Sequence, residues 1–217
     1  MTSRDRLTTA RLVGVVASSG LLVLLVVVVG LWTPHYDQLA YTVSRLGSPG
    51  EPHAVIARVG FVLYGLLVIA GAGPLAGYGG RLAPWFARLV AVYGAAGLVV
   101  GLAPKDLPGT PTTTTGSIHV AATVVGGAAI LAAMVVVAWR APCHRDRRTA
   151  RMVAPVTAVS AVVFPLTWGT AIYGLVERVL IGSVTIWLTV LAVQLLATPR
   201  PTGVITAEHG RPIGLEE

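Results

Sequence analysis

An uncharged run from Leu12 to Leu31 constrains this chain more than any other feature. A helix of about 20 apolar residues crosses the hydrocarbon core of a bilayer. Only 12% of the 217 residues are charged, which is about half the share found in a soluble domain. The sequence therefore predicts an all-α integral membrane bundle of six transmembrane helices, at about 12–31, 54–78, 84–103, 117–139, 152–173 and 177–197.

The first apolar run is predicted to stay in the protein as a transmembrane helix. It exceeds the roughly 7–15 apolar residues of a signal peptide, and no small-residue cleavage site follows it. Trp32 and Tyr36 come next, and aromatic residues of this kind favour the membrane–water interface. We therefore divide the chain into a cytoplasmic segment 1–11, a transmembrane domain 12–197 and a flexible cytoplasmic tail 198–217.

Basic residues are distributed unevenly between the two sides of the predicted bundle. Twelve of the 16 lie on the side that holds both termini, and Arg45, Arg58, Lys105 and Arg178 lie on the other. Cytoplasmic loops carry the excess of arginine and lysine in membrane proteins. We therefore predict an N-in, C-in topology in the cell (inner) membrane.

The net charge of +7 is explained by this topology and does not indicate nucleic-acid binding, because no basic patch interleaved with aromatic residues is present.

Arginine greatly outnumbers lysine, and alanine, valine and glycine are abundant, which suggests a GC-rich bacterial genome. Cys143 is the one cysteine, so an intramolecular disulfide is excluded.

Several classes of function are disfavoured by what the predicted helices lack. No acidic or basic residue lies at the middle of a predicted span, whereas ion-coupled transporters place such residues at mid-membrane. No phosphate-binding, serine-hydrolase or zinc-protease motif is present. We predict neither a cofactor nor a metal, and membrane lipids as the partners. A homo-oligomer or a membrane protein partner stays open.

Polar residues gather at the predicted extracytoplasmic ends of the helices. In an enzyme, His119 would act as a base, Asp106 or Glu177 would orient it, and Arg58 or Arg178 would neutralise a phosphate. Each has a simpler interpretation. The two arginines are typical interface anchors, Glu177 complements the dipole of its helix, and His119 bonds to loop backbone.

These positions also carry a family resemblance. The residues that carry it are Pro34-His35-Tyr36, the segments 44–50 and 103–106, His119, and Glu177-Arg178. Together they resemble the prokaryotic membrane protein family catalogued as domain of unknown function 998. The resemblance implies six transmembrane helices and no settled activity. It adds Ser44 and the adjacent Arg45 to the candidate lipid-binding residues, with Arg58 and Arg178, while Asp106, His119 and Glu177 form the candidate catalytic set.

Three functions are compatible with this sequence. The favoured one is a lipid-binding or scaffold module with a polar extracytoplasmic pocket. The second is a membrane-embedded enzyme that acts on a lipid or a membrane-proximal substrate through His119 with Asp106 or Glu177. The third is a small uncoupled transporter, in which the proline-containing helix at 152–173 would move.

Overall fold

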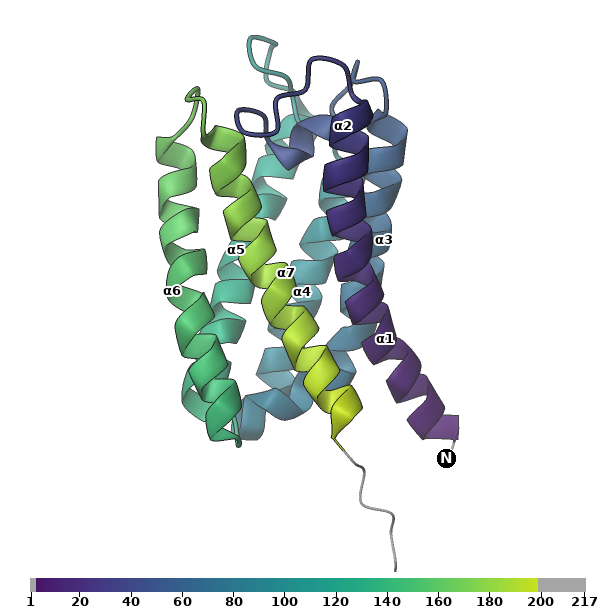
Figure 1. The fold of residues 1–217 in the computed structure, drawn as a ribbon, viewed down its shortest axis with the longest axis vertical. Helices are drawn as coiled ribbons and strands as arrows, with labels where there is room; N and C mark the ends of the chain where they lie inside the picture. The colour runs from purple at the N-terminus through teal and green to yellow at the C-terminus, as the bar shows by residue number, and fades with distance from the viewer. Residues whose placement is uncertain (1–2, 199–217) are drawn as a thin grey trace, which may run out of the picture.

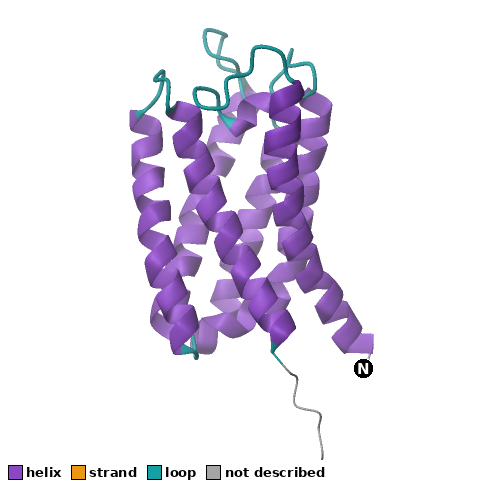
Figure 2. Ribbon diagram, in the orientation of Figure 1, coloured by secondary structure: helices purple, strands orange, loops and turns teal. Residues whose placement is uncertain are grey.

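The computed structural model describes residues 3–198, which form a bundle of helices joined by short segments (Figure 1). The described residues contain helices and loops but no strand (Figure 2). The long helices are α1 Ser3–Leu24, α3 Ala54–Leu75, α4 Ala83–Leu102, α5 Thr114–Arg140, α6 His144–Leu166 and α7 Tyr173–Ala197. The predicted tail 198–217 lies outside the described residues, except for Thr198.

Within residues 3–198, five helical stretches are long and apolar enough to cross a membrane. They are Ser3–Trp32, Ala54–Leu102, Thr114–Arg140, His144–Leu166 and Tyr173–Ala197. Large aliphatic side chains such as Leu24, Val124 and Val162 are exposed on their outer surfaces. A protein folded in water rarely leaves so many of them uncovered, whereas hydrocarbon solvates them well. The all-α prediction is confirmed, and the chain has the features of a multi-pass membrane protein.

The first helical stretch contains a break in the regular hydrogen-bond pattern. α1 continues into a π-helix, η1 Leu25–Val29, and then into the short α2 Gly30–Trp32. The Gln38 side chain returns from the following loop and donates a hydrogen bond to the Val26 carbonyl at 3.3 Å. Such single-turn π segments are frequent at functional sites. Here the π-helix is the place where the first loop is fastened to the helix below it.

The stretch Ala54–Leu102 is 49 residues long, more than twice the length that one crossing needs. It contains a 3₁₀ segment, η3 Ala76–Leu82, in which Gly80 has φ 54° and ψ −123°. Only glycine adopts that conformation without strain. The chain turns there, so that α3 and α4 pack against each other along the bundle (Figure 1).

α6 begins earlier than the sequence suggested. The basic segment 140–151 was expected to be a loop before a helix at 152–173, but only residues 141–143 connect α5 to α6. Arg145, Arg147, Arg148 and Arg151 therefore lie on the first two turns of α6. Arginine is a good helix former and the segment contains no glycine. A high density of arginine is therefore compatible with a helix and does not by itself indicate a loop. α6 ends at Leu166, directly after Pro165, where a kink was expected.

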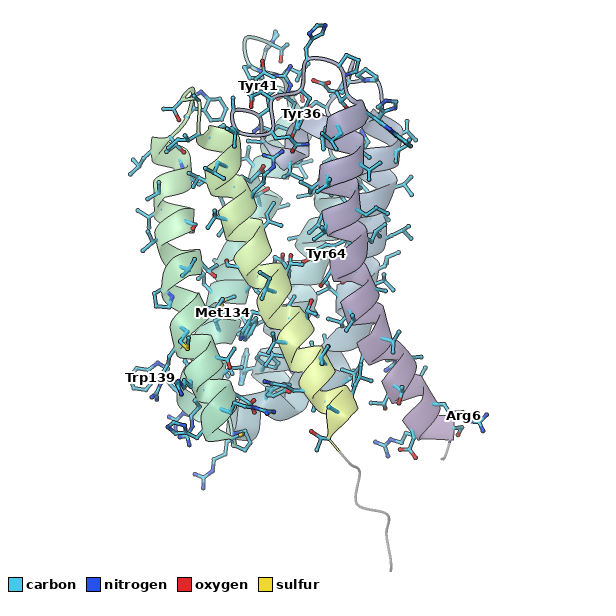
Figure 3. The ribbon with its side chains drawn as sticks, viewed as in Figure 1. Arg6, Tyr36, Tyr41, Tyr64, Met134 and Trp139 are labelled. Carbon is cyan, nitrogen blue, oxygen red and sulfur yellow. The ribbon has the colours of Figure 1, made fainter. Side chains whose placement is uncertain are left out.

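The helix ends define two different faces of the bundle. Segments 33–53, 103–113 and 167–172 lie at one end, which we call the loop end, and the start of α1 and the end of α7 lie at the other (Figures 1 and 2). In Figure 3, Tyr36 and Tyr41 mark the loop end, while Arg6 and Trp139 mark the opposite end. All the predicted site residues belong to the loop end.

Candidate functional site at the loop end

Glu177 and Arg178 fasten the first loop to the start of α7. Glu177 is only 7% exposed, and its carboxylate accepts hydrogen bonds from the Val43 backbone N–H and from the Ser44 hydroxyl, the latter at 3.0 Å. These two donors belong to η2 Val43–Gly47, a 3₁₀ turn of the first loop. The buried carboxylate is therefore satisfied by the loop that covers it.

The Arg178 guanidinium binds the preceding part of the same loop. It donates to the Tyr41 carbonyl at 2.8 Å, to the Tyr36 hydroxyl at 2.9 Å and to the Gln38 side-chain oxygen at 2.7 Å. A Cβ on Gly174 would collide with the Tyr41 carbonyl. Glycine at that position is what lets the loop lie directly on α7.

Tyr36 is held inside this cluster of hydrogen bonds. Its hydroxyl donates to the Thr42 carbonyl at 2.8 Å and accepts from Arg178. Burial raises the pKa of Tyr36 to about 12, although the Arg178 guanidinium opposes the shift. The phenol is therefore a neutral hydrogen-bonding group that keeps the loop in place.

The other two candidate arginines also contact the protein itself. Arg58 Nε donates to the Gly47 carbonyl at 2.7 Å, at the end of η2. Arg45 Nε donates to Glu51 Oε1 at 2.8 Å, and its guanidinium carbon lies 3.8 Å from the ring centre of Tyr41. Arg58 therefore supports the loop, whereas Arg45 combines an ion pair with an aromatic contact.

His119 and Asp106 each make their hydrogen bonds to a different part of the chain. His119 is 4% exposed, and its Nδ1 donates to the Ala103 carbonyl at the end of α4, at 2.8 Å. The two Asp106 oxygens accept from the Thr113 backbone N–H at 2.8 Å and the Thr113 hydroxyl at 2.7 Å. Among residues 3–198, no hydrogen bond or ion pair joins His119 to a carboxylate.

These contacts also set the ionisation of Asp106. The two hydrogen bonds from Thr113 stabilise the carboxylate and lower the pKa of Asp106. Thr113 is the N-cap of α5 and accepts the Gly116 N–H at 3.0 Å. Asp106 therefore fixes the start of α5, and through α5 the position of His119.

An open pocket of about 280 Å³ lies where the three loop-end segments meet. Its walls come from three separated parts of the chain: Ala40, Tyr41, Thr42, Arg45 and Ser48; Lys105, Asp106, Leu107 and Pro108; Trp168, Gly169, Thr170, Ala171 and Tyr173. Two of the predicted site residues, Arg45 and Asp106, line it. Ser44, Arg58, His119, Glu177 and Arg178 instead hold the surrounding loops and helix ends.

Lys105 is the pocket residue that the sequence-based site omitted. Its ammonium donates to Thr42 Oγ1 at 3.3 Å and lies 5.4 Å from the ring centres of both Trp168 and Tyr173. Burial lowers the pKa of Lys105, and the nearby Glu177 carboxylate opposes that shift. Within the described residues, no ion pair neutralises this ammonium. The sequence held one signal that could have identified it, because Lys105 is the single lysine of an arginine-rich chain and lies on the side poor in basic residues.

Residues 3–198 contain no group of three or more His, Cys, Asp or Glu side chains placed to hold a metal ion. What the pocket offers is two cations, hydroxyls and aromatic walls. Arg45 forms an ion pair with Glu51, and the Asp106 carboxylate accepts hydrogen bonds from Thr113. Lys105 is therefore the charged residue of the pocket with the least compensation.

The five long apolar helical stretches of residues 3–198 place this protein among multi-pass membrane proteins. The family described as "Protein of unknown function (DUF998)" matches residues 16–194, so the chain belongs to that family. This confirms the resemblance found in the sequence. Neither a curated protein nor a solved structure matches the chain.

Proposed function

We propose that this protein crosses the bilayer six times and binds the anionic phosphate headgroup of a membrane lipid in the loop-end pocket. The 49-residue stretch supports the count, because it folds back at Gly80 into two packed helices of about 20 residues each, α3 and α4. The start of α1 and the end of α7 lie at one end of the bundle, as an even number of crossings requires (Figure 1). The excess of arginine at that end supports a cytoplasmic location for it.

The observation that carries the ligand assignment is the partial burial of Lys105 without an ion pair. Removing an ammonium from water is costly unless an opposite charge compensates it. A phosphate group in the pocket would supply that charge, and Thr42 and Thr170 line the same space. A pocket at the helix ends lies at headgroup depth, so a membrane lipid reaches it without leaving the bilayer.

The catalytic assignment of His119, Asp106 and Glu177 finds less support. The contacts of all three are accounted for by Ala103, Thr113, Val43 and Ser44. A general base needs a free nitrogen within reach of a substrate proton, and His119 faces the backbone of α4. We therefore favour binding over catalysis.

Lipid retention tests the ligand assignment. The protein is placed in nanodiscs of phosphatidylglycerol and phosphatidylcholine, and the anionic lipid that stays bound is counted by native mass spectrometry. Loss of a charge-assisted hydrogen bond costs about 1.5–3 kcal/mol, so Lys105→Gln should weaken retention about tenfold or more. Arg88→Gln is the matched control, because Arg88 makes a comparable contact with Trp85, 5.0 Å from the ring centre, outside this pocket. Equal retention by the Lys105 variant and the parent protein would contradict the assignment.

The topology has its own test in Cys143, which is exposed between α5 and α6. We expect a membrane-impermeant maleimide to label Cys143 only after the cells are opened. A Cys143→Ser, Thr110→Cys variant should be labelled in intact cells, because Thr110 lies at the loop end. Labelling of Cys143 in intact cells would show that the orientation is inverted.

A further inference from the structure

The segment between α4 and α5 has a composition that the lipid-binding proposal does not use. Residues 108–115 read Pro-Gly-Thr-Pro-Thr-Thr-Thr-Thr, and every one of them is exposed. In Figure 1 this segment is the teal loop that rises beyond the helix ends. Exposed stretches rich in threonine and proline are typical of O-glycosylated segments, because proline keeps the backbone extended and the hydroxyls stay accessible.

The threonine hydroxyls of this segment differ in how they are engaged. Thr110 donates to the Leu107 carbonyl at 2.7 Å, Thr113 donates to Asp106 at 2.7 Å, and Thr115 lies 2.8 Å from the Thr113 hydroxyl. In the described chain, the hydroxyls of Thr112 and Thr114 make no hydrogen bond to another residue. Modification of either hydroxyl therefore breaks no hydrogen bond among the described residues.

Backbone conformation separates the two remaining hydroxyls. Thr114 is the first residue of α5. Thr112 lies between Pro111 and Thr113 in a stretch without regular structure, and its N-cap neighbour Thr113 is extended, with φ −99° and ψ 164°. A transferase must bind several backbone groups of its acceptor at once. Non-helical backbone leaves those groups available, whereas the carbonyl of a first helical residue already accepts a hydrogen bond within the helix.

We propose that Thr112 is an acceptor for an O-linked sugar on the extracytoplasmic side of the membrane. A glycosidic bond forms between Thr112 Oγ1 and the anomeric carbon of the sugar. The bond from that carbon to the phosphate of a lipid-linked sugar phosphate breaks, and the hydroxyl proton leaves to the released phosphate or to a base of the transferase. The inference rests on the proposed orientation, because lipid-linked donors of this class are used outside the cytoplasm.

A glycan at this position would stand beside the pocket without filling it. Leu107 and Pro108 form part of the pocket wall, but the residues from 109 to 112 do not line it. The sugar would extend into water from the outermost loop, where no packed side chain has to move. Glycosylation and lipid retention are therefore separable properties of the same face.

Mass spectrometry of the full-length protein, purified from the membranes of the cells that encode it, tests the proposal. We expect intact protein heavier by one or more hexose units, and a fragment spectrum that places the sugar on Thr112. Thr112→Ala should abolish the added mass, whereas Thr112→Ser keeps a hydroxyl and should retain it. Thr114→Ala is the matched control and should be modified like the parent protein.

Three results would overturn the proposal: an unmodified mass for the parent protein, an added mass that survives Thr112→Ala, or a mass increment of phosphate in place of a hexose. Failure here is distinguishable from failure of the topology. The Cys143 labelling reports orientation directly, so a correctly oriented but unmodified protein contradicts the glycosylation alone. Folding of each variant is checked by its elution from size-exclusion chromatography.

Discussion

Ser44 and Glu177, 133 residues apart in the chain, are joined by a hydrogen bond of 3.0 Å from Ser44 Oγ to Glu177 Oε1. Together with the Val43 N–H, this bond holds η2 against α7. The first loop is therefore positioned by a buried carboxylate on α7, the last helix. The stability of this loop depends on α7 as well as on the turns within the loop.

The first prediction concerns that bond. Glu177→Ala leaves the Val43 N–H without its acceptor, and an unsatisfied buried donor costs about 1–3 kcal/mol. We expect a lower midpoint of thermal unfolding in detergent. Ser44→Ala should have a smaller effect, since it removes one donor of about 1 kcal/mol. Ser117→Ala is the control, because Ser117 is exposed and bonds only within its own helix turn. Equal midpoints for the Ser44 and Ser117 variants would contradict the role of Ser44.

The second prediction uses the shape of the Arg178 side chain. Its guanidinium reaches Tyr36, Gln38 and Tyr41 at the same time, which the single ammonium of lysine does not reproduce. Arg178→Lys should therefore raise the proteolysis rate of the first loop, although the charge is kept. Arg148→Lys, on the exposed face of α6, should leave that rate unchanged. An unchanged rate in the Arg178 variant would show that charge alone holds the loop.

The third prediction separates a structural role of His119 from a catalytic one. His119→Asn keeps a side-chain N–H near the position of Nδ1, so it should preserve the bond to Ala103 and most of the stability. His119→Leu leaves the buried Ala103 carbonyl unpaired, and we expect it to lower the free energy of unfolding by about 1–3 kcal/mol. Equal stability of the two variants would remove the structural explanation and return His119 to the catalytic candidates.

The helices of this protein could be predicted from the sequence because hydrocarbon imposes a length and a composition on every crossing. The run 12–31 and the boundary at Ala54 are clear for that reason. The start of α6 was misplaced, since charge marks the membrane boundary but not the end of a helix. Helix ends in water are set by capping and turn residues, and 144–151 contains no strong breaker.

The candidate site was predictable only in part, for a different physical reason. The uneven distribution of basic residues between the two sides predicted that Glu177, Arg178 and His119 share one end of the bundle. In the structure all three lie at the loop end. Which of them face a pocket depends on the path of the loops, which no local pattern encodes. The partners of Glu177 lie more than 130 residues away. Lys105 lies in the pocket because the segment after α4 brings its ammonium to the Thr42 hydroxyl and to the ring of Trp168.

The last prediction is a pH dependence of lipid retention that arises from Lys105. Burial lowers the pKa of the free Lys105 ammonium, and a bound phosphate would raise it again by compensating the charge. Between those two pKa values the complex holds a proton that the free protein lacks. Retention should therefore weaken as the pH rises through that window, by up to about tenfold per pH unit for one proton. Glu177 and Arg45 also act on Lys105, but in opposite directions.

Native mass spectrometry of the nanodisc complex across the alkaline range measures this dependence. Phosphatidylglycerol does not titrate there, so a change in its retention reports the protein. Lys105→Arg keeps a positive charge that does not titrate, and its retention should stay flat where that of the parent protein falls. A parallel fall in both proteins would assign the pH dependence to another group and contradict this prediction.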